Sequence, residues 1–121
     1  MNAGHSILAG RPLLLVEDED LIAADLTRIF EAAGAEVVGP VATLDDALDL
    51  VDDTTHLDGA VLDINLAGEM AYAVADALSL CGVPFVFATG YDEGSIPPAY
   101  AHVTRCEKPV EPERIVRALF G

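Results

Sequence analysis

Five polar side chains in this sequence stand at the ends of short apolar runs that we interpret as buried strands. They are Glu17, Asp18, Asp63, Thr89 and Lys108. If these strands lie parallel, their carboxyl ends share one edge of a sheet, which is where ligands bind in open α/β folds. The sequence therefore predicts that three carboxylates, a hydroxyl and an ammonium converge at one place.

This set of groups suits phosphoryl chemistry that depends on a metal ion. Three carboxylates at close range repel one another unless a cation neutralises them, and Mg²⁺ is the hard cation we expect. A carboxylate such as that of Asp63 can attack phosphorus and give an acyl phosphate. The metal and Lys108 would then offset charge on the phosphoryl oxygens, and Thr89 could donate a hydrogen bond to them.

The elements that must position these groups alternate along the chain between strand and helix. Continuous apolar runs predict buried strands at 12–16, 37–38, 59–63, 83–88 and 103–107. Apolar residues at helical spacing predict helices over 21–33, 44–51, 71–81 and from Pro112 onward. The pattern predicts the α/β class, with a doubly wound parallel sheet covered by helices on both faces. Residues 1–10 are interpreted as a flexible leader and 11–121 as one domain.

The segment from Tyr91 to Tyr100 interrupts this alternation. It occupies the place of a fourth helix, yet it contains Gly94 and the pair Pro97-Pro98. Proline inside a helix removes a hydrogen bond and costs about 3 kcal/mol. We therefore expect the fourth helix to be short or mobile.

Length and charge exclude several function classes. The chain has 121 residues, 21 acidic against six basic, and a formal net charge of −15. Nucleic-acid phosphates and anionic membrane surfaces would repel it, so we expect neither as a partner. No apolar run is long enough to span a membrane. Cys81 and Cys106 form no CxxC motif and are predicted to be core or near-core residues in a reducing compartment, which indicates a cytoplasmic protein.

Four short motifs, in this order and spacing, resemble those of the receiver domains of bacterial two-component response regulators over essentially the whole chain. They are LLLVEDE at 13–19, AVLD at 60–63, FATG at 87–90 and KP at 108–109. The resemblance implies a flavodoxin-like receiver fold of five parallel strands in the order 2-1-3-4-5.

The same resemblance implies a role for each site residue. Asp63 would be the phosphoacceptor, and Thr89 and Lys108 would contact the phosphoryl group. Mg²⁺ would be held by Asp18 and Asp63, by Glu17 mostly through water, and by the backbone carbonyl of Asn65.

The implied partners are a histidine kinase or a phosphotransfer protein as donor and an unidentified downstream protein. The chain would act through protein binding or as a phosphate sink, and not as a turnover enzyme. The motif Phe-Ala-Thr-Gly followed by Tyr91 is similar to that of alphaproteobacterial receivers, often stand-alone, which commonly pair with kinases of the HWE or a related type.

One position departs from the family pattern. Most receivers carry an aromatic residue three positions before the lysine, and here that residue is Arg105. The usual coupling of threonine to an aromatic ring cannot operate with arginine. Our hypothesis is that switching runs instead through reordering of the segment 91–100.

Three alternatives stay open on the sequence alone. A degenerate receiver would bind a partner without phosphorylation, although the complete acidic set with Thr89 and Lys108 argues against it. A Mg²⁺-dependent phosphohydrolase would need a second aspartate two residues after Asp63, where this chain has Asn65. An FMN carrier would need Gly, Ser or Thr in the first loop, which is acidic here.

Asn65 could orient a water molecule or only shape the turn.

Overall fold

The computed structural model describes residues 7–66, 68–89, 96–108 and 110–120. Five parallel strands form the main sheet, and these are β1 (Pro12–Val16), β2 (Glu36–Val41), β3 (Gly59–Asp63), β6 (Phe85–Thr89) and β7 (Arg105–Glu107). Their order in space is β2-β1-β3-β6-β7, which confirms the predicted order 2-1-3-4-5. The helices are α1 (Asp20–Ala32), α2 (Leu44–Asp53), α3 (Tyr72–Leu80) and α4 (Pro112–Phe120).

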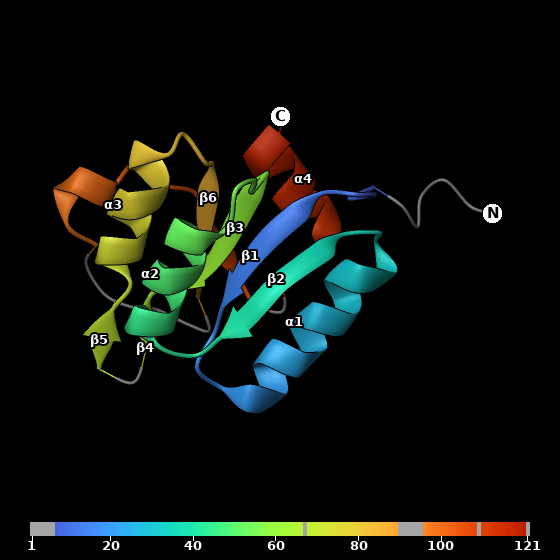
Figure 1. Ribbon diagram of the computed structural model, residues 1–121, viewed down its shortest axis with the longest axis horizontal. Helices are drawn as coiled ribbons and strands as arrows, with labels where there is room; N and C mark the ends of the chain where they lie inside the picture. Colours follow the sequence, from blue (N-terminus) through green and yellow to red (C-terminus); the bar gives the residue numbers. More distant parts are fainter. Residues whose placement is uncertain (1–6, 67, 90–95, 109, 121) are drawn as a thin grey trace.

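Helices cover both faces of the sheet because successive strand residues point to opposite sides (Figure 1). Leu13 and Leu15 of β1 pack in one core cluster with residues of α1 and α4. Leu14 and Val16 pack in a second cluster with residues of α2 and α3. Every residue of β3 is buried, so this strand lies at the centre of the molecule and reads as a continuous apolar run.

The second strand is longer than the apolar pair Val37-Val38 predicted. It continues through Gly39 to Val41, with an irregularity in its pairing to β1 between Leu14 and Val16. Gly39 has φ of 100°, a left-handed conformation that glycine adopts without strain. The pair Gly39-Pro40 lies within this edge strand, where proline is tolerated.

The predicted leader, residues 1–10, includes residues that pack in the core. Leu8 is fully buried and belongs to the core cluster that contains Phe30 and Ala33. Its backbone N–H donates to the carbonyl of Ala33 at 2.9 Å, and Gly10 N–H donates to Gly34 at 3.0 Å. Residues 7–10 are therefore part of the domain, while 1–6 lie outside the described residues.

The predicted short fourth helix is a single turn of 3-10 helix, η2 (Pro98–Tyr100). Residues 90–95, which the hypothesis of a reordering segment also includes, lie outside the described residues. A two-stranded antiparallel hairpin, β4 (Asn65–Leu66) with β5 (Glu69–Met70), follows β3 and was not predicted. Strands of two residues carry too little periodicity to be recognised in a sequence.

Two surface residues contradict the predicted apolar faces. Cys81 is exposed beyond the end of α3, whereas Cys106 is buried as predicted. Leu21, predicted on the buried stripe of the first helix, is 84% exposed. Both residues lie at helix ends, where even the inner face of a helix extends past the elements that it packs against. None of the helices in the described part of the chain is long and apolar enough to cross a membrane.

Replacing Leu8 by alanine tests whether residues 7–10 belong to the domain. Removing a fully buried leucine leaves a cavity, so we expect the free energy of unfolding to fall by about 2–4 kcal/mol. Urea denaturation measures this change. Leu80→Ala is the matched control, since Leu80 is 89% exposed, and it should cost less than about 0.5 kcal/mol. Equal effects of the two substitutions would contradict the assignment.

Candidate functional site

The carboxyl edge of the sheet gathers four of the five predicted polar side chains. Glu17 and Asp18 follow the last residue of β1, Asp63 is the last residue of β3, and Lys108 follows the last residue of β7. β1 and β3 are hydrogen-bonded neighbours in parallel register, so their ends coincide. The sheet topology therefore brings groups that are 91 residues apart in sequence into contact.

The acidic groups form a tight cluster. Glu17, Asp18 and Asp63 each offer a carboxylate oxygen, and these three atoms lie within 4.8 Å of one another. Glu17 is 2% exposed and Asp63 is 7% exposed, so two of the three carboxylates are shielded from water. The second oxygen of Glu17 accepts a hydrogen bond from the Glu19 backbone N–H at 3.1 Å, which fixes its orientation.

Lys108 is the cation of this cluster. Its ammonium nitrogen lies 2.5 Å from Oε1 of Glu17 and 3.7 Å from Oδ1 of Asp63. Burial lowers the pKa of Lys108, but the hydrogen bond to Glu17 and the nearby carboxylates outweigh that effect and hold the pKa above its ordinary value. The ammonium is therefore charged at neutral pH and partly compensates the three carboxylates.

Lys108 does not fully compensate the negative charge of the three carboxylates, and the pKa of Asp63 is affected. Burial, a hydrogen bond with Asp18 and the negative charge of Glu17 raise the pKa of Asp63 from 3.8 to about 7, against the lowering effect of Lys108. A carboxyl group with this pKa is about half protonated at neutral pH. The site as it stands has more negative charge than its own ammonium can neutralise.

This donor set fits a hard divalent cation. Oxygen ligands alone, most of them carboxylates, are the ligands that Mg²⁺ prefers, and a bound cation would supply the missing positive charge. Glu17, Asp18 and Asp63 are the residues of the described chain that could hold it.

The side chain of Asn65 shapes the turn after β3. Its Oδ1 accepts a hydrogen bond from the Gly68 backbone N–H at 2.7 Å, across the loop of the β4–β5 hairpin. The sequence left open whether this side chain orients a water molecule or only shapes the turn, and the structure shows it shaping the turn. The role predicted for its backbone carbonyl stays a prediction.

Thr89 is the last residue of β6, and its backbone pairs with Glu107 of β7. Its position at the same sheet edge is the predicted one, but its side chain lies outside what the structure describes. Tyr91 and Pro109 also lie outside the described residues.

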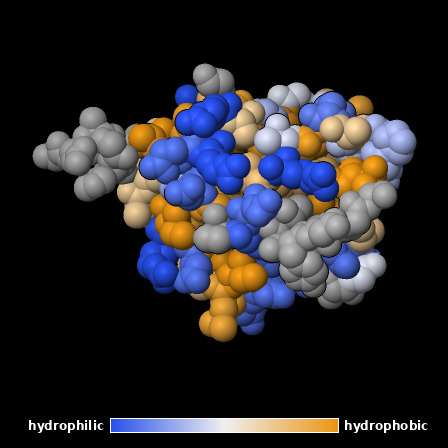
Figure 2. All heavy atoms as spheres, turned by 180° about the vertical axis from the view of Figure 1, so that it is seen from behind, coloured by the Kyte–Doolittle hydropathy of each residue, from blue (hydrophilic) through white to orange (hydrophobic). Residues whose placement is uncertain are grey.

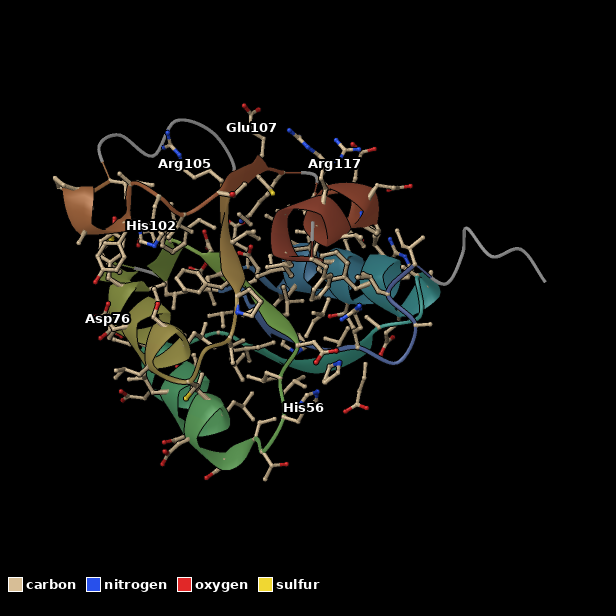
Figure 3. The ribbon with its side chains drawn as sticks, turned by 90° about the horizontal axis from the view of Figure 1, so that it is seen from above. His56, Asp76, His102, Arg105, Glu107 and Arg117 are labelled. Atoms are coloured by element: carbon tan, nitrogen blue, oxygen red, sulfur yellow. The ribbon has the colours of Figure 1, made fainter. Side chains whose placement is uncertain are left out.

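Sequence reasoning missed an aromatic contact between α3 and η2. The rings of Tyr72 on α3 and Tyr100 of η2 stack with centroids 4.6 Å apart, and the Tyr100 hydroxyl donates to Asp76 at 2.8 Å. Tyr72 also meets Phe87 of β6 edge to face, with centroids 6.1 Å apart. These contacts hold η2 against α3, and Figure 3 shows Asp76 on that side of the molecule. Arg105, the residue in place of the usual aromatic, is exposed at the start of β7.

The chain is similar in sequence to a curated protein. It is 34% identical over 95 residues to the phyllosphere-induced regulator PhyR of Methylorubrum extorquens, an alignment that covers 75% of this chain. The chain spans 36% of the length of that relative. No family model matches the chain.

Solved structures extend the similarity to nearly the whole chain. SdrG from Sphingomonas melonis Fr1 is 37% identical and matches 98% of this chain and 96% of its own, with a TM-score of 0.78. The BeF3-activated conformation of SdrG from Pseudomonas melonis Fr1 is 38% identical over 92% of this chain and 94% of its own, with a TM-score of 0.73. The response regulator PhyR from Brucella abortus is 29% identical over 95% of this chain and 51% of its own, with a TM-score of 0.74.

The raised pKa of Asp63 predicts a pH-dependent cost in the metal-free protein. A group whose folded-state pKa is raised stabilises the fold below its unfolded pKa of 3.8, and this contribution is lost as the pH rises through about 7. Asp63→Asn removes the charge, so its stability relative to wild type should increase by on the order of 4 kcal/mol between about pH 4 and pH 8.

Urea denaturation in the presence of EDTA measures this difference. Asp45→Asn is the control, because Asp45 is an exposed carboxylate on α2. It should follow the pH profile of wild type. A constant difference between Asp63→Asn and wild type across this pH range would contradict the charge imbalance.

Proposed function

Since this chain belongs to the response-regulator receiver family, we propose that it accepts a phosphoryl group on Asp63 from a phosphohistidine of a histidine kinase or phosphotransfer protein. The observation that carries the proposal is the meeting of Asp63 with two further carboxylates and Lys108 at one sheet edge. A buried carboxylate beside an ammonium and a potential metal site is a suitable nucleophile toward phosphorus.

The proposed step is a transfer between two side chains. An oxygen of Asp63 attacks the phosphorus, the bond from phosphorus to the donor imidazole nitrogen breaks, and the electron pair returns to that imidazole. Asp63 must be ionised to attack, so neutralising its surroundings favours the reaction. Lys108, already 3.7 Å from Oδ1 of Asp63, is positioned to contact a phosphoryl oxygen on that atom.

In this proposal Mg²⁺ would be held by the side chains of Asp18 and Asp63, by Glu17 mostly through water, and by the backbone carbonyl of Asn65. The ion would supply positive charge that offsets the carboxylates and the transferred phosphoryl oxygens. The hydrogen bond from Glu19 N–H and the contact with Lys108 hold the Glu17 carboxylate in a fixed orientation. Such support from neighbouring groups is what precise metal ligation needs.

The proposal extends to the signalling context. Thr89, at the end of β6, would donate a hydrogen bond to the phosphoryl group and couple phosphorylation to the segment that follows. The donor kinase would be of the HWE type, acting in the cytoplasm, and the output would be binding of a downstream protein or removal of phosphoryl groups from the kinase. The similarity to SdrG, which has been solved in a BeF3-activated conformation, supports this context.

Phosphorylation by acetyl phosphate tests the proposal directly. We expect intact-mass spectrometry to show a gain of one phosphoryl group that requires Mg²⁺ and is lost in Asp63→Asn. Asp45→Asn removes an equivalent but exposed carboxylate and should be phosphorylated as wild type is. If wild type stays unmodified both with acetyl phosphate and with a panel of HWE-type kinases, the chain is a phosphorylation-independent adaptor instead.

Binding of Mg²⁺ tests the ligand set separately. We expect Asp18→Asn to weaken Mg²⁺ affinity by at least about tenfold, since it removes a charged ligand. Calorimetric titration measures the affinity. Glu19→Gln is the neighbouring control, because Glu19 is exposed and lies outside the carboxylate cluster, and it should change affinity by less than about threefold. Equal losses in the two variants would contradict the assignment.

A further inference from the structure

The six basic residues of this chain fall into two groups. Three are paired in the structure, because Arg11 contacts Asp58, Arg28 contacts Asp25, and Lys108 contacts Glu17 and Asp63. The other three form no ion pair within the part of the chain that the structure describes. They are Arg105, Arg114 and Arg117.

These three arginines, which have no carboxylate partner among the described residues, line one cavity. It has a volume of about 230 Å³ and is formed between β7 and α4, with the lining residues Thr104, Arg105, Cys106, Arg114, Arg117 and Ala118. Arg114 and Arg117 are three positions apart on α4 and share a helix face. Cys106 and Arg114 line the same cavity, where burial raises the pKa of the Cys106 thiol and the positive charge of Arg114 acts in the opposite direction.

The lack of partners stands out against the composition of the chain. With 21 acidic residues against six basic ones, a typical arginine has many carboxylates available. Exposed glutamates even lie close in sequence, at Glu107, Glu111 and Glu113, yet none of them pairs with an arginine of the cavity. Figure 3 shows Arg105, Glu107 and Arg117 along one edge of the molecule, and Glu107 is not among the residues that line the cavity.

The surroundings of the cavity can accommodate a length of polypeptide. β7 ends the order of strands, so one side of its backbone faces no neighbouring strand within the described residues. An edge strand with free hydrogen-bonding groups is a place where an extended segment can lie. Viewed from behind, the molecule shows hydrophilic side chains interspersed with hydrophobic ones (Figure 2).

We propose that the cavity between β7 and α4 binds an acidic segment of a partner protein through Arg105, Arg114 and Arg117. Guanidinium groups form charge-assisted, often bidentate hydrogen bonds with carboxylates. The net charge of −15 disfavours a polyanion such as nucleic acid, because the field of the whole chain repels it. A short acidic segment carries few charges and loses less to that repulsion.

The test is an NMR titration of the ¹⁵N-labelled full chain, unphosphorylated and without Mg²⁺, at low ionic strength. The probe is a short peptide of alternating glutamate and valine. We expect shift changes concentrated at the arginine side chains of the cavity and along β7. The same peptide with glutamine in place of glutamate should cause no such changes. Because phosphorylation is not involved, failure here would leave the phosphoacceptor role of Asp63 untouched.

Single substitutions assign the binding to the cavity. Arg105→Gln and Arg117→Gln should each weaken binding of the acidic peptide by roughly threefold to tenfold. Arg28→Gln is the matched control, since it removes the same positive charge from an exposed position on α1 and should leave affinity unchanged. Equal weakening in the control would show a general charge effect and overturn the proposal.

Three further outcomes would also overturn it. One is the absence of any localised shift at the highest peptide concentration, and another is tighter binding of a single-stranded oligothymidylate of equal charge. The third is self-association of the chain without peptide that Arg105→Gln abolishes, which would assign the cavity to a second copy.

Discussion

The repulsion among three carboxylates held within 4.8 Å of one another is the constraint on which the rest of this structure depends. Two of these groups are buried, and the only described ammonium in contact with them is that of Lys108. Burial, the hydrogen bond with Asp18 and the charge of Glu17 raise the pKa of Asp63 to about 7, and the cluster is a place where added positive charge is favourable. A fold that maintains such a cluster must be held firmly from elsewhere.

That support comes from the two apolar layers on either side of the sheet. Alternate residues of β1 and β3 are anchored in separate core clusters, so neither strand can shift without disturbing both. The buried Leu8 adds the start of the described chain to one of these layers. Stable packing beneath the site allows the strand ends to carry groups that destabilise one another, an arrangement common at functional sites.

Charge is distributed unevenly over the remaining surface. The acidic cluster lies at the carboxyl edge of the sheet, whereas three arginines surround a cavity between β7 and α4. Arg105 belongs to that cavity and takes the position that an aromatic residue occupies in most receivers. The stacked pair Tyr72 and Tyr100 lies instead between α3 and η2, and it connects η2 to the helix layer.

The sequence alone determined the alternation of strands and helices and the residues at the carboxyl edge of the sheet, whereas the strand order was implied only by the resemblance to receiver domains. Buried parallel strands are continuous apolar runs, and the polar residue that ends each run is visible without coordinates. The carboxylate cluster and Lys108 were predictable for this reason, although their roles in phosphoryl transfer remain proposals. The burial of Leu8 and the contact between Tyr72 and Tyr100 were not. The cavity that Arg105 shares with Arg114 and Arg117 was equally unpredictable. Each of these features depends on which surfaces far apart in the sequence come into contact, and a local sequence pattern carries no signal for such contacts. Only the tertiary structure decides them, because the hydrophobic effect buries whatever apolar surface the packing of the whole chain brings together.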